Sequence, residues 1–279
     1  MIHKTINLKD FYPMLENDVF LTSYCPDNYA EFSSEKLRKC VLVLPGGGYG
    51  WLSDREAEPV ALRFAGANIA SFVLKYSIAS KIKYPNPFVD VFAALAYIRK
   101  NYNVFHIDVN AISVIGFSAG GHLAASCSAY HTSEEFAKFL NISIDEMKIN
   151  GCILGYPVIS SSSEFTHMGS IMNVTGGNKE LMEKFSVENH VSKDFPKTFI
   201  WHTTFDGAVP LKNSLVLANA LHENKIFFEM HIYPMLDHGQ SLADDSVYGA
   251  NMMSKENLAL MKHNTQWVDN AIHFVKEYV

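Results

Sequence analysis

Short runs rich in Val, Ile and aromatic residues alternate with helical patterns along most of this 279-residue chain. Seven runs have the length and composition of β-strands, namely residues 19–24, 40–44, 69–74, 111–115, 152–155, 198–202 and 227–233. Helical patterns lie between several of them, at 57–64, at positions 88, 91, 95 and 98, at 211–221, and in a last helix with Trp267, Ala271, Phe274 and Tyr278 on one stripe. This alternation predicts an α/β fold with a mostly parallel sheet and helices on both faces.

The chain contains no internal repeat, low-complexity tract or Pro/Gly/Ser-rich linker. We therefore expect one domain, residues 1–279, that carries insertions. One insertion or cap is expected around 158–196, which includes the polar loop 160–163. A loop around 239–256 is longer than the fold requires, and we expect it to contact the substrate or a second subunit of a homo-oligomer.

Composition and charge disfavour several classes of function. The net charge of −6 gives no basic surface for nucleic acid. No apolar run approaches the ~18 residues of a membrane span, and residues 1–7 lack the apolar segment of a signal peptide. We expect a cytoplasmic protein without a nucleic-acid or membrane partner.

The four cysteines, Cys25, Cys40, Cys127 and Cys152, are widely spaced. They form no C-x-x-C pair and no Cys/His cluster with the spacing of metal ligands. Buried free thiols are the expected state, and neither a metal nor a cofactor is expected.

The segment Gly116-Phe117-Ser118-Ala119-Gly120 stands between a β-branched run and an Ala-rich helical run. A nucleophile elbow needs this strand, turn and helix, with glycines two residues to either side of a serine in a strained backbone conformation. The bare pattern occurs by chance in roughly one chain in ten of this length. The hypothesis that Ser118 is a nucleophile therefore depends on its context.

A serine hydroxyl needs a base within hydrogen-bond reach and a third group to orient that base. His238 and Asp206 each follow a predicted strand, and the order Ser, Asp, His is the chain order of α/β-hydrolases. As alternatives, His238 could cap a turn and Asp206 could start the helix after Pro210.

Other acids and bases fit these roles less well. Asp237 is adjacent to His238 and so is poorly placed to pair with it, and Asp244, Asp245 and Glu229 rank lower still. We expect His202 and His122 to be structural hydrogen-bonding residues.

Three glycines, Gly46 to Gly48, follow the strand at 40–44. Consecutive glycines let backbone N–H groups turn toward an oxyanion, and the N–H of Ala119 at a helix start would be the partner donor. A phosphate-binding loop is the rival interpretation, but no Gly-Lys-Ser/Thr and no G-x-G-x-x-G accompanies the triplet.

Several further segments extend the likeness to known enzymes. They are Pro45-Gly46-Gly47-Gly48-Tyr49, Arg55-Glu56-Ala57-Glu58-Pro59, the elbow continued as Gly121-His122-Leu123-Ala124, Gly155-Tyr156-Pro157-Val158, His202-Thr203 with Asp206 and Val209-Pro210, and His238-Gly239. Together they resemble the α/β-hydrolase esterases, the group of acetylxylan esterase-like and feruloyl esterase-like enzymes and the lipases and esterases with an HGGG loop. The chain departs from that group at Pro45, which replaces the loop histidine, and at Phe205, where many relatives have a second acid.

The resemblance implies an α/β-hydrolase fold, with Ser118 as nucleophile, His238 as base and Asp206 as orienting acid. It also implies that Gly47, Gly48 and Ala119 donate to the oxyanion, and that short acyl esters, often of carbohydrates, are hydrolysed without a cofactor.

From the residues, Tyr49 and Trp51 are candidates to contact the substrate, because aromatic rings beside a glycine loop can stack on a sugar. They could equally belong to the core.

We expect a serine carboxylesterase that hydrolyses short-chain, chiefly acetyl, esters of sugars or oligosaccharides. An amidase, arylformamidase or small-peptide hydrolase with the same triad is the alternative. A non-catalytic binding module on a hydrolase scaffold is a further one.

Overall fold

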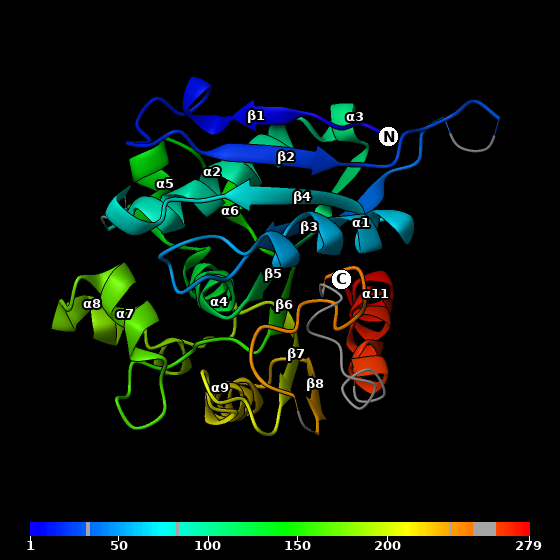
Figure 1. Ribbon diagram of the computed structural model, residues 1–279. Helices are drawn as coiled ribbons and strands as arrows, with labels where there is room; N and C mark the ends of the chain where they lie inside the picture. The colour runs from blue at the N-terminus through cyan, green and yellow to red at the C-terminus, as the bar shows by residue number, and fades with distance from the viewer. Residues whose placement is uncertain (32–33, 82–83, 235, 248–260) are drawn as a thin grey trace.

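The computed structural model describes residues 1–31, 34–81, 84–234, 236–247 and 261–279 (Figure 1). The strands are β1 (Thr5–Asn7), β2 (Phe20–Tyr24), β3 (Arg38–Leu44), β4 (Ala70–Lys75), β5 (Ile107–Phe117), β6 (Gly151–Gly155), β7 (Lys197–Thr203) and β8 (Phe228–Tyr233). The helices are α1 (Glu58–Gly66), α2 (Asn86–Lys100), α3 (Tyr102–Phe105), α4 (Ala119–Tyr130), α5 (Glu134–Leu140), α6 (Ile144–Met147), α7 (Met168–Thr175), α8 (Lys179–Lys184), α9 (Lys212–Glu223) and α11 (Gln266–Tyr278).

The eight described strands form one sheet in the order β1-β2-β4-β3-β5-β6-β7-β8. The pairs β1·β2 and β2·β4 are antiparallel, and every pair from β4 to β8 is parallel. Strand β5 lies at the centre between β3 and β6, so the turn that follows it is surrounded by the ends of other parallel strands. Functional groups gather at this carboxyl edge in open parallel sheets.

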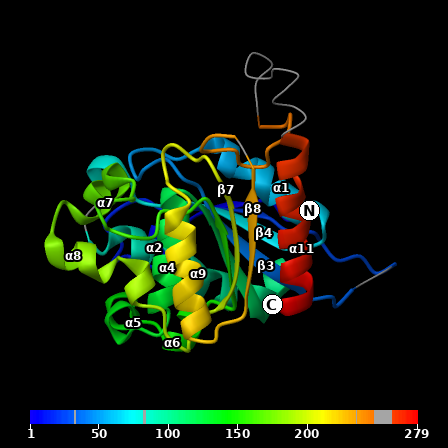
Figure 2. The same ribbon diagram turned by 90° about the horizontal axis from the view of Figure 1, so that it is seen from below.

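Helices cover both faces of the sheet: α1 and α11 pack on one face, and α2, α4 and α9 on the other (Figure 2). The strands alternate accordingly. In β3, Leu42 and Leu44 belong to the core under α2 and α4, whereas Val41 and Val43 belong to the core under α1 and α11. Burial on both faces explains why β3 is an almost continuous apolar run.

The predicted α/β architecture and all seven predicted strands are confirmed, with boundaries that differ by up to four residues. The prediction missed β1, a three-residue edge strand whose short polar sequence carries no β pattern. It also missed the short helices α3, α5 and α6. The four cysteines are buried and free, as predicted. Among the described helices, none has the length and apolar character needed to cross a membrane.

Candidate active site

Ser118 occupies the sharp turn between β5 and α4, with φ 53° and ψ −119°. A non-glycine residue in this region of backbone space is strained, and such strain is typical of functional positions. The turn is held by neighbouring backbone, because the Ser118 N–H donates to the Gly155 carbonyl at 3.0 Å. A Cβ on Gly116 would lie 2.1 Å from the Gly120 carbonyl oxygen, so the predicted requirement for glycine is confirmed there.

The structure brings the predicted serine, histidine and acid together from three strand ends. His238 Nε2 lies 2.8 Å from Ser118 Oγ, and His238 Nδ1 lies 2.7 Å from Asp206 Oδ2. With the Nδ1–H donated to the carboxylate, Nε2 is free to accept the serine proton. The Tyr156 ring packs edge-on against the imidazole, with centroids 4.9 Å apart, and limits its rotation.

Asp206 is held in place by the loop that follows it. Its Oδ1 accepts the N–H groups of Ala208 at 3.0 Å and Val209 at 2.8 Å, while Oδ2 faces His238. Burial by itself would raise the pKa of Asp206, but hydrogen bonds from His202 and His238 outweigh it and hold the pKa well below its usual range. The acid is therefore a carboxylate at neutral pH.

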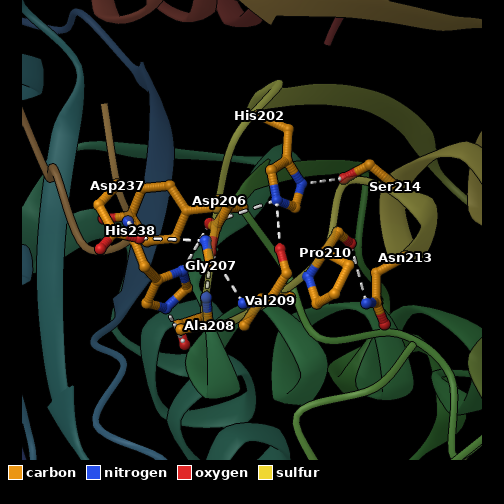
Figure 3. A network of polar contacts seen from close by, with 12 residues as sticks. His202, Asp206, Gly207, Ala208, Val209, Pro210, Asn213, Ser214, Asp237 and His238 are labelled. Carbon is orange, nitrogen blue, oxygen red and sulfur yellow. Dashed lines mark hydrogen bonds and ion pairs between the residues drawn. The ribbon is translucent and has the colours of Figure 1, made fainter. Parts of the chain in front are cut away.

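A second histidine, His202, also contacts the Asp206 carboxylate (Figure 3). His202 Nε2 lies 2.9 Å from the Val209 carbonyl oxygen and 3.4 Å from Asp206 Oδ2, and Nδ1 lies 2.8 Å from Ser214 Oγ. Because a carbonyl only accepts, Nε2 carries the proton and directs it toward the acid loop. His202 is thus a structural hydrogen-bonding residue as predicted, with contact to Asp206 that the sequence did not indicate.

The rival residues have other roles. Asp237 accepts the N–H groups of Gly207 at 3.1 Å and of His238 at 2.8 Å, so it links two loops and does not face the imidazole nitrogens. His122 is fully buried between the Tyr49 hydroxyl at 2.8 Å and the Phe185 carbonyl at 2.9 Å. Burial lowers the pKa of His122 to about 4, which keeps it neutral.

The glycine loop after β3 presents backbone donors beside Ser118. The Gly46 carbonyl accepts from Ser53, the Gly47 carbonyl from Gly50, and the Gly48 carbonyl from the side chain of Asn173 at 2.8 Å. Across the described parts of the chain, the N–H groups of Gly47, Gly48 and Ala119 donate to no protein acceptor. Three carbonyls are therefore engaged while three N–H groups remain available for a substrate oxygen.

A pocket of about 430 Å³ opens over Ser118 and His238. Its walls include Gly47, Gly48, Gly50, Trp51, Ser53, Arg55, Glu56, His167, Gly169, Asn173, Ala208 and Gly239. Trp51 is 58% exposed at this wall, where its ring can meet a ligand.

The expectation that Tyr49 contacts the substrate is wrong. Its side chain is fully buried and does not line the pocket, and its hydroxyl donates to His122 Nδ1, because the Nε2 of this neutral ring carries the proton toward the Phe185 carbonyl. The φ of 61° at Tyr49 follows two glycines with positive φ, and at this turn the ring packs into the core beside Tyr76. Tyr49 thus anchors the glycine loop to the core.

The segment predicted as an insertion, 158–196, contains α7 and α8, and His167, Gly169 and Asn173 from it form one pocket wall. Of the loop expected around 239–256, residues 248–256 lie outside the described residues. The described part, 239–247, contributes Gly239 to the pocket. Among the described residues no group of three His, Cys, Asp or Glu side chains could hold a metal ion.

Sequence reasoning missed three residues of this site: Glu56, His167 and Asn173. Glu56 stands in a segment that carried part of the resemblance, so a signal existed there. His167 and Asn173 lie in the predicted insertion 158–196, but nothing in the sequence singled them out, because they reach the site only through the packing of α7 against the glycine loop.

The central sheet, the strained serine turn after β5 and the order of the site residues along the chain define an α/β-hydrolase. Solved structures agree. The chain superposes on the acetyl ester-xyloside bifunctional hydrolase from Caldicellulosiruptor lactoaceticus with a TM-score of 0.76 and 34% identity over 96% of each chain. It also superposes on the carboxylesterase Cest-2923 from Lactobacillus plantarum, with a TM-score of 0.77 and 23% identity over 97% of each chain. At this level of identity the match shows a shared fold.

Residues 27–221 match the model of the BD-FAE family, and the chain belongs to that family. It is 33% identical over 233 residues to endo-1,4-beta-xylanase B of Butyrivibrio fibrisolvens. This alignment covers 81% of this chain and 36% of that protein. It is 28% identical over 242 residues to the acetylxylan esterase of Xylanibacter ruminicola, covering 84% of this chain and 45% of that protein. The chain thus spans less than half the length of these two relatives. The resemblance to acetylxylan esterase-like α/β-hydrolases is confirmed.

Proposed function

We propose that this protein is a serine carboxylesterase that removes acetyl groups from sugars or oligosaccharides through an acyl-enzyme intermediate. The observation that carries the proposal is the unbroken hydrogen-bond chain from Ser118 through His238 to Asp206, set beside free N–H groups of a glycine loop. The names of the relatives, an acetylxylan esterase and an acetyl ester-xyloside hydrolase, support an acetylated carbohydrate as the substrate.

In the proposed reaction, Ser118 Oγ attacks the ester carbonyl carbon while His238 Nε2 takes the serine proton. The carbonyl oxygen becomes an oxyanion that accepts hydrogen bonds from Gly47, Gly48 and Ala119. Collapse of this intermediate breaks the bond to the alcohol oxygen, which takes the proton from the imidazolium. Water, activated by His238, then attacks the acyl-serine in the same way and releases the carboxylic acid and free Ser118.

The alcohol half of the substrate would meet the wall formed by the insertion, where His167 offers a neutral donor. His167 Nδ1 accepts the Ser170 N–H at 3.2 Å, so the neutral ring carries its proton on Nε2. Burial and the nearby His238 lower the pKa of His167, which favours this neutral form. Within the described structure Nε2 bonds to no protein group, and a sugar hydroxyl is a fitting acceptor for its proton.

Replacing His167 with alanine should raise KM for acetylated xylo-oligosaccharides about tenfold and leave KM for p-nitrophenyl acetate within about twofold. Loss of one hydrogen bond of about 1.4 kcal/mol corresponds to that factor. His190→Ala is the matched control, because His190 lies in the same insertion but bonds to the Glu183 carbonyl away from the pocket. Equal KM increases for the sugar and aryl esters would contradict a role in sugar recognition.

The test of the function is a substrate panel for the wild type with Ser118→Ala as control. The panel contains p-nitrophenyl acetate, butyrate and octanoate, acetylated xylo-oligosaccharides, and N-formylkynurenine for the amidase alternative. We expect acetyl esters to be hydrolysed fastest and sugar acetates to have the highest kcat/KM. A preference for the formamide, or acetate release that survives Ser118→Ala, would contradict the proposal.

A further inference from the structure

A buried carboxylate joins two loops of the site and has no part in the proton transfers described above. Glu56 ends the short 3₁₀ helix Asp54–Glu56 and is only 3% exposed. Its Oε2 accepts the Gly46 N–H at 2.8 Å, and its Oε1 accepts the Tyr156 hydroxyl at 2.7 Å. Glu56 therefore contacts the glycine loop directly, one residue before the proposed oxyanion donors.

Tyr156 extends this contact to the loop that carries His238. Its hydroxyl accepts the Ser241 N–H at 2.8 Å, and its ring packs edge-on against the His238 imidazole at 71°. The Ser241 carbonyl in turn accepts Trp267 Nε1–H at 2.9 Å, which ties the loop to α11. One carboxylate thus connects the oxyanion loop with the loop of the base.

The chemistry of these contacts requires two acceptor oxygens. The Gly46 N–H can only donate, and the Tyr156 hydroxyl donates toward Glu56 because a carboxylate oxygen only accepts, while the hydroxyl oxygen accepts the Ser241 N–H. A glutamine at this place would present one oxygen and one NH₂. Either the Gly46 N–H would face a donor, or the Tyr156 hydroxyl would have to give up its donated hydrogen bond and accept the NH₂ beside the Ser241 N–H. Burial raises the pKa of Glu56, against the hydrogen bonds from Tyr156 and Gly46, and an apolar side chain would be cheaper to bury.

We propose that Glu56 is a positioning residue of the proposed esterase reaction: it holds the glycine loop and the His238 loop in mutual register around Ser118. This inference rests on the proposed function and adds to it a residue that never touches the reacting atoms. Misplacement of donors in an active site lowers turnover more than ground-state binding.

The test compares Glu56→Gln with Glu58→Gln. Glu58 is a matched control two residues along the chain, because its Oε2 accepts the Tyr24 hydroxyl at 2.8 Å in a second tyrosine–glutamate pair that does not line the pocket. For Glu56→Gln we expect kcat for p-nitrophenyl acetate to fall about 10- to 100-fold with KM within about twofold. Glu58→Gln should match the wild type in both constants.

Two further measurements separate positioning from general loss of structure. Hydrogen exchange should quicken in residues 46–50 and 237–242 of folded Glu56→Gln and remain unchanged in Glu58→Gln. Tyr156→Phe keeps the ring that packs on His238 and removes the hydroxyl. Its effect combined with Glu56→Gln should be smaller than the product of the single effects, because both break one network. If Glu56→Gln does not fold, Tyr156→Phe alone is measured in its place.

Wild-type kcat in Glu56→Gln, unchanged exchange in both segments, or fully multiplicative losses in the double variant would overturn the role of Glu56 while the proposed function stands. A wild-type protein that hydrolyses no ester in the panel would instead overturn the proposed function, and the catalytic role of Glu56 with it.

Discussion

Replacing Asp206 with asparagine is expected to lower kcat/KM for p-nitrophenyl acetate by about 10³- to 10⁴-fold without unfolding the protein. The reason lies in the partners of the two carboxylate oxygens. Oδ1 accepts the backbone N–H groups of Ala208 and Val209, which can only donate. The amide oxygen of an asparagine will therefore take the Oδ1 position, and its NH₂ will point at His238.

An NH₂ group facing His238 Nδ1 reverses the tautomer. Nδ1 then accepts, the proton moves to Nε2, and the imidazole can no longer take the proton of Ser118. Ser118 then has no base to take its proton, although the substitution only replaces one carboxylate oxygen by an NH₂ group. Steady-state kinetics with a thermal unfolding curve for the same sample measures both parts of this expectation.

Asp237→Asn is the control for this prediction. Asp237 is the neighbouring carboxylate and accepts the backbone N–H groups of Gly207 and His238, a role that an amide oxygen can keep. We expect kcat/KM to fall by less than about tenfold. If Asp237→Asn were as damaging as Asp206→Asn, the assignment of Asp206 as the orienting acid would be wrong.

Replacing Gly120 with alanine is expected to destabilise the protein by about 3 kcal/mol or more and to abolish activity. A Cβ at this position would lie 2.2 Å from the Leu44 carbonyl oxygen and 2.5 Å from that of Pro45. Both contacts are with backbone, so no side-chain rotation relieves them. Helix α4 would have to move away from the end of β3, and the Ala119 N–H would move away from the glycine loop with it.

Gly66→Ala is the matched control, because nothing lies within 4 Å of a Cβ built there. Gly66 is the last residue of α1, where alanine is the better helix former. We expect the melting temperature of Gly66→Ala to equal or exceed that of the wild type, and that of Gly120→Ala to fall by several degrees or more. Equal melting temperatures for wild type and Gly120→Ala would show that the tight contact between α4 and β3 is not required.

The sheet and the grouping of Ser118, Asp206 and His238 could be predicted because their signals are local. Ser118, Asp206 and His238 each follow an apolar run within a few residues, and the parallel topology brings the ends of those runs to one edge of the sheet. Ser118, Asp206 and His238 are separated by up to 120 residues yet needed no knowledge of side-chain packing to be placed together.

The residues that were missed or misplaced depend on packing between distant segments. Asn173 bonds to Gly48 across 125 residues, and Glu56 meets Tyr156 across 100. No spacing rule in one sequence relates such positions. Tyr49 is predicted to contact the substrate because it is an aromatic residue beside a glycine loop. In the structure its hydroxyl instead bonds to the buried His122.

The most direct test of Ser118 as the nucleophile is to trap the acyl-enzyme. Turnover of p-nitrophenyl acetate is quenched with acid after milliseconds to seconds, and the acetyl group is located by peptide mass mapping in wild type and Ser118→Ala. We expect an acetyl group on the peptide that contains Ser118, formed and lost at the rate of turnover, and its absence from the variant. Acetylation at another residue at that rate, or turnover with Ser118 unmodified throughout, would contradict this role of Ser118.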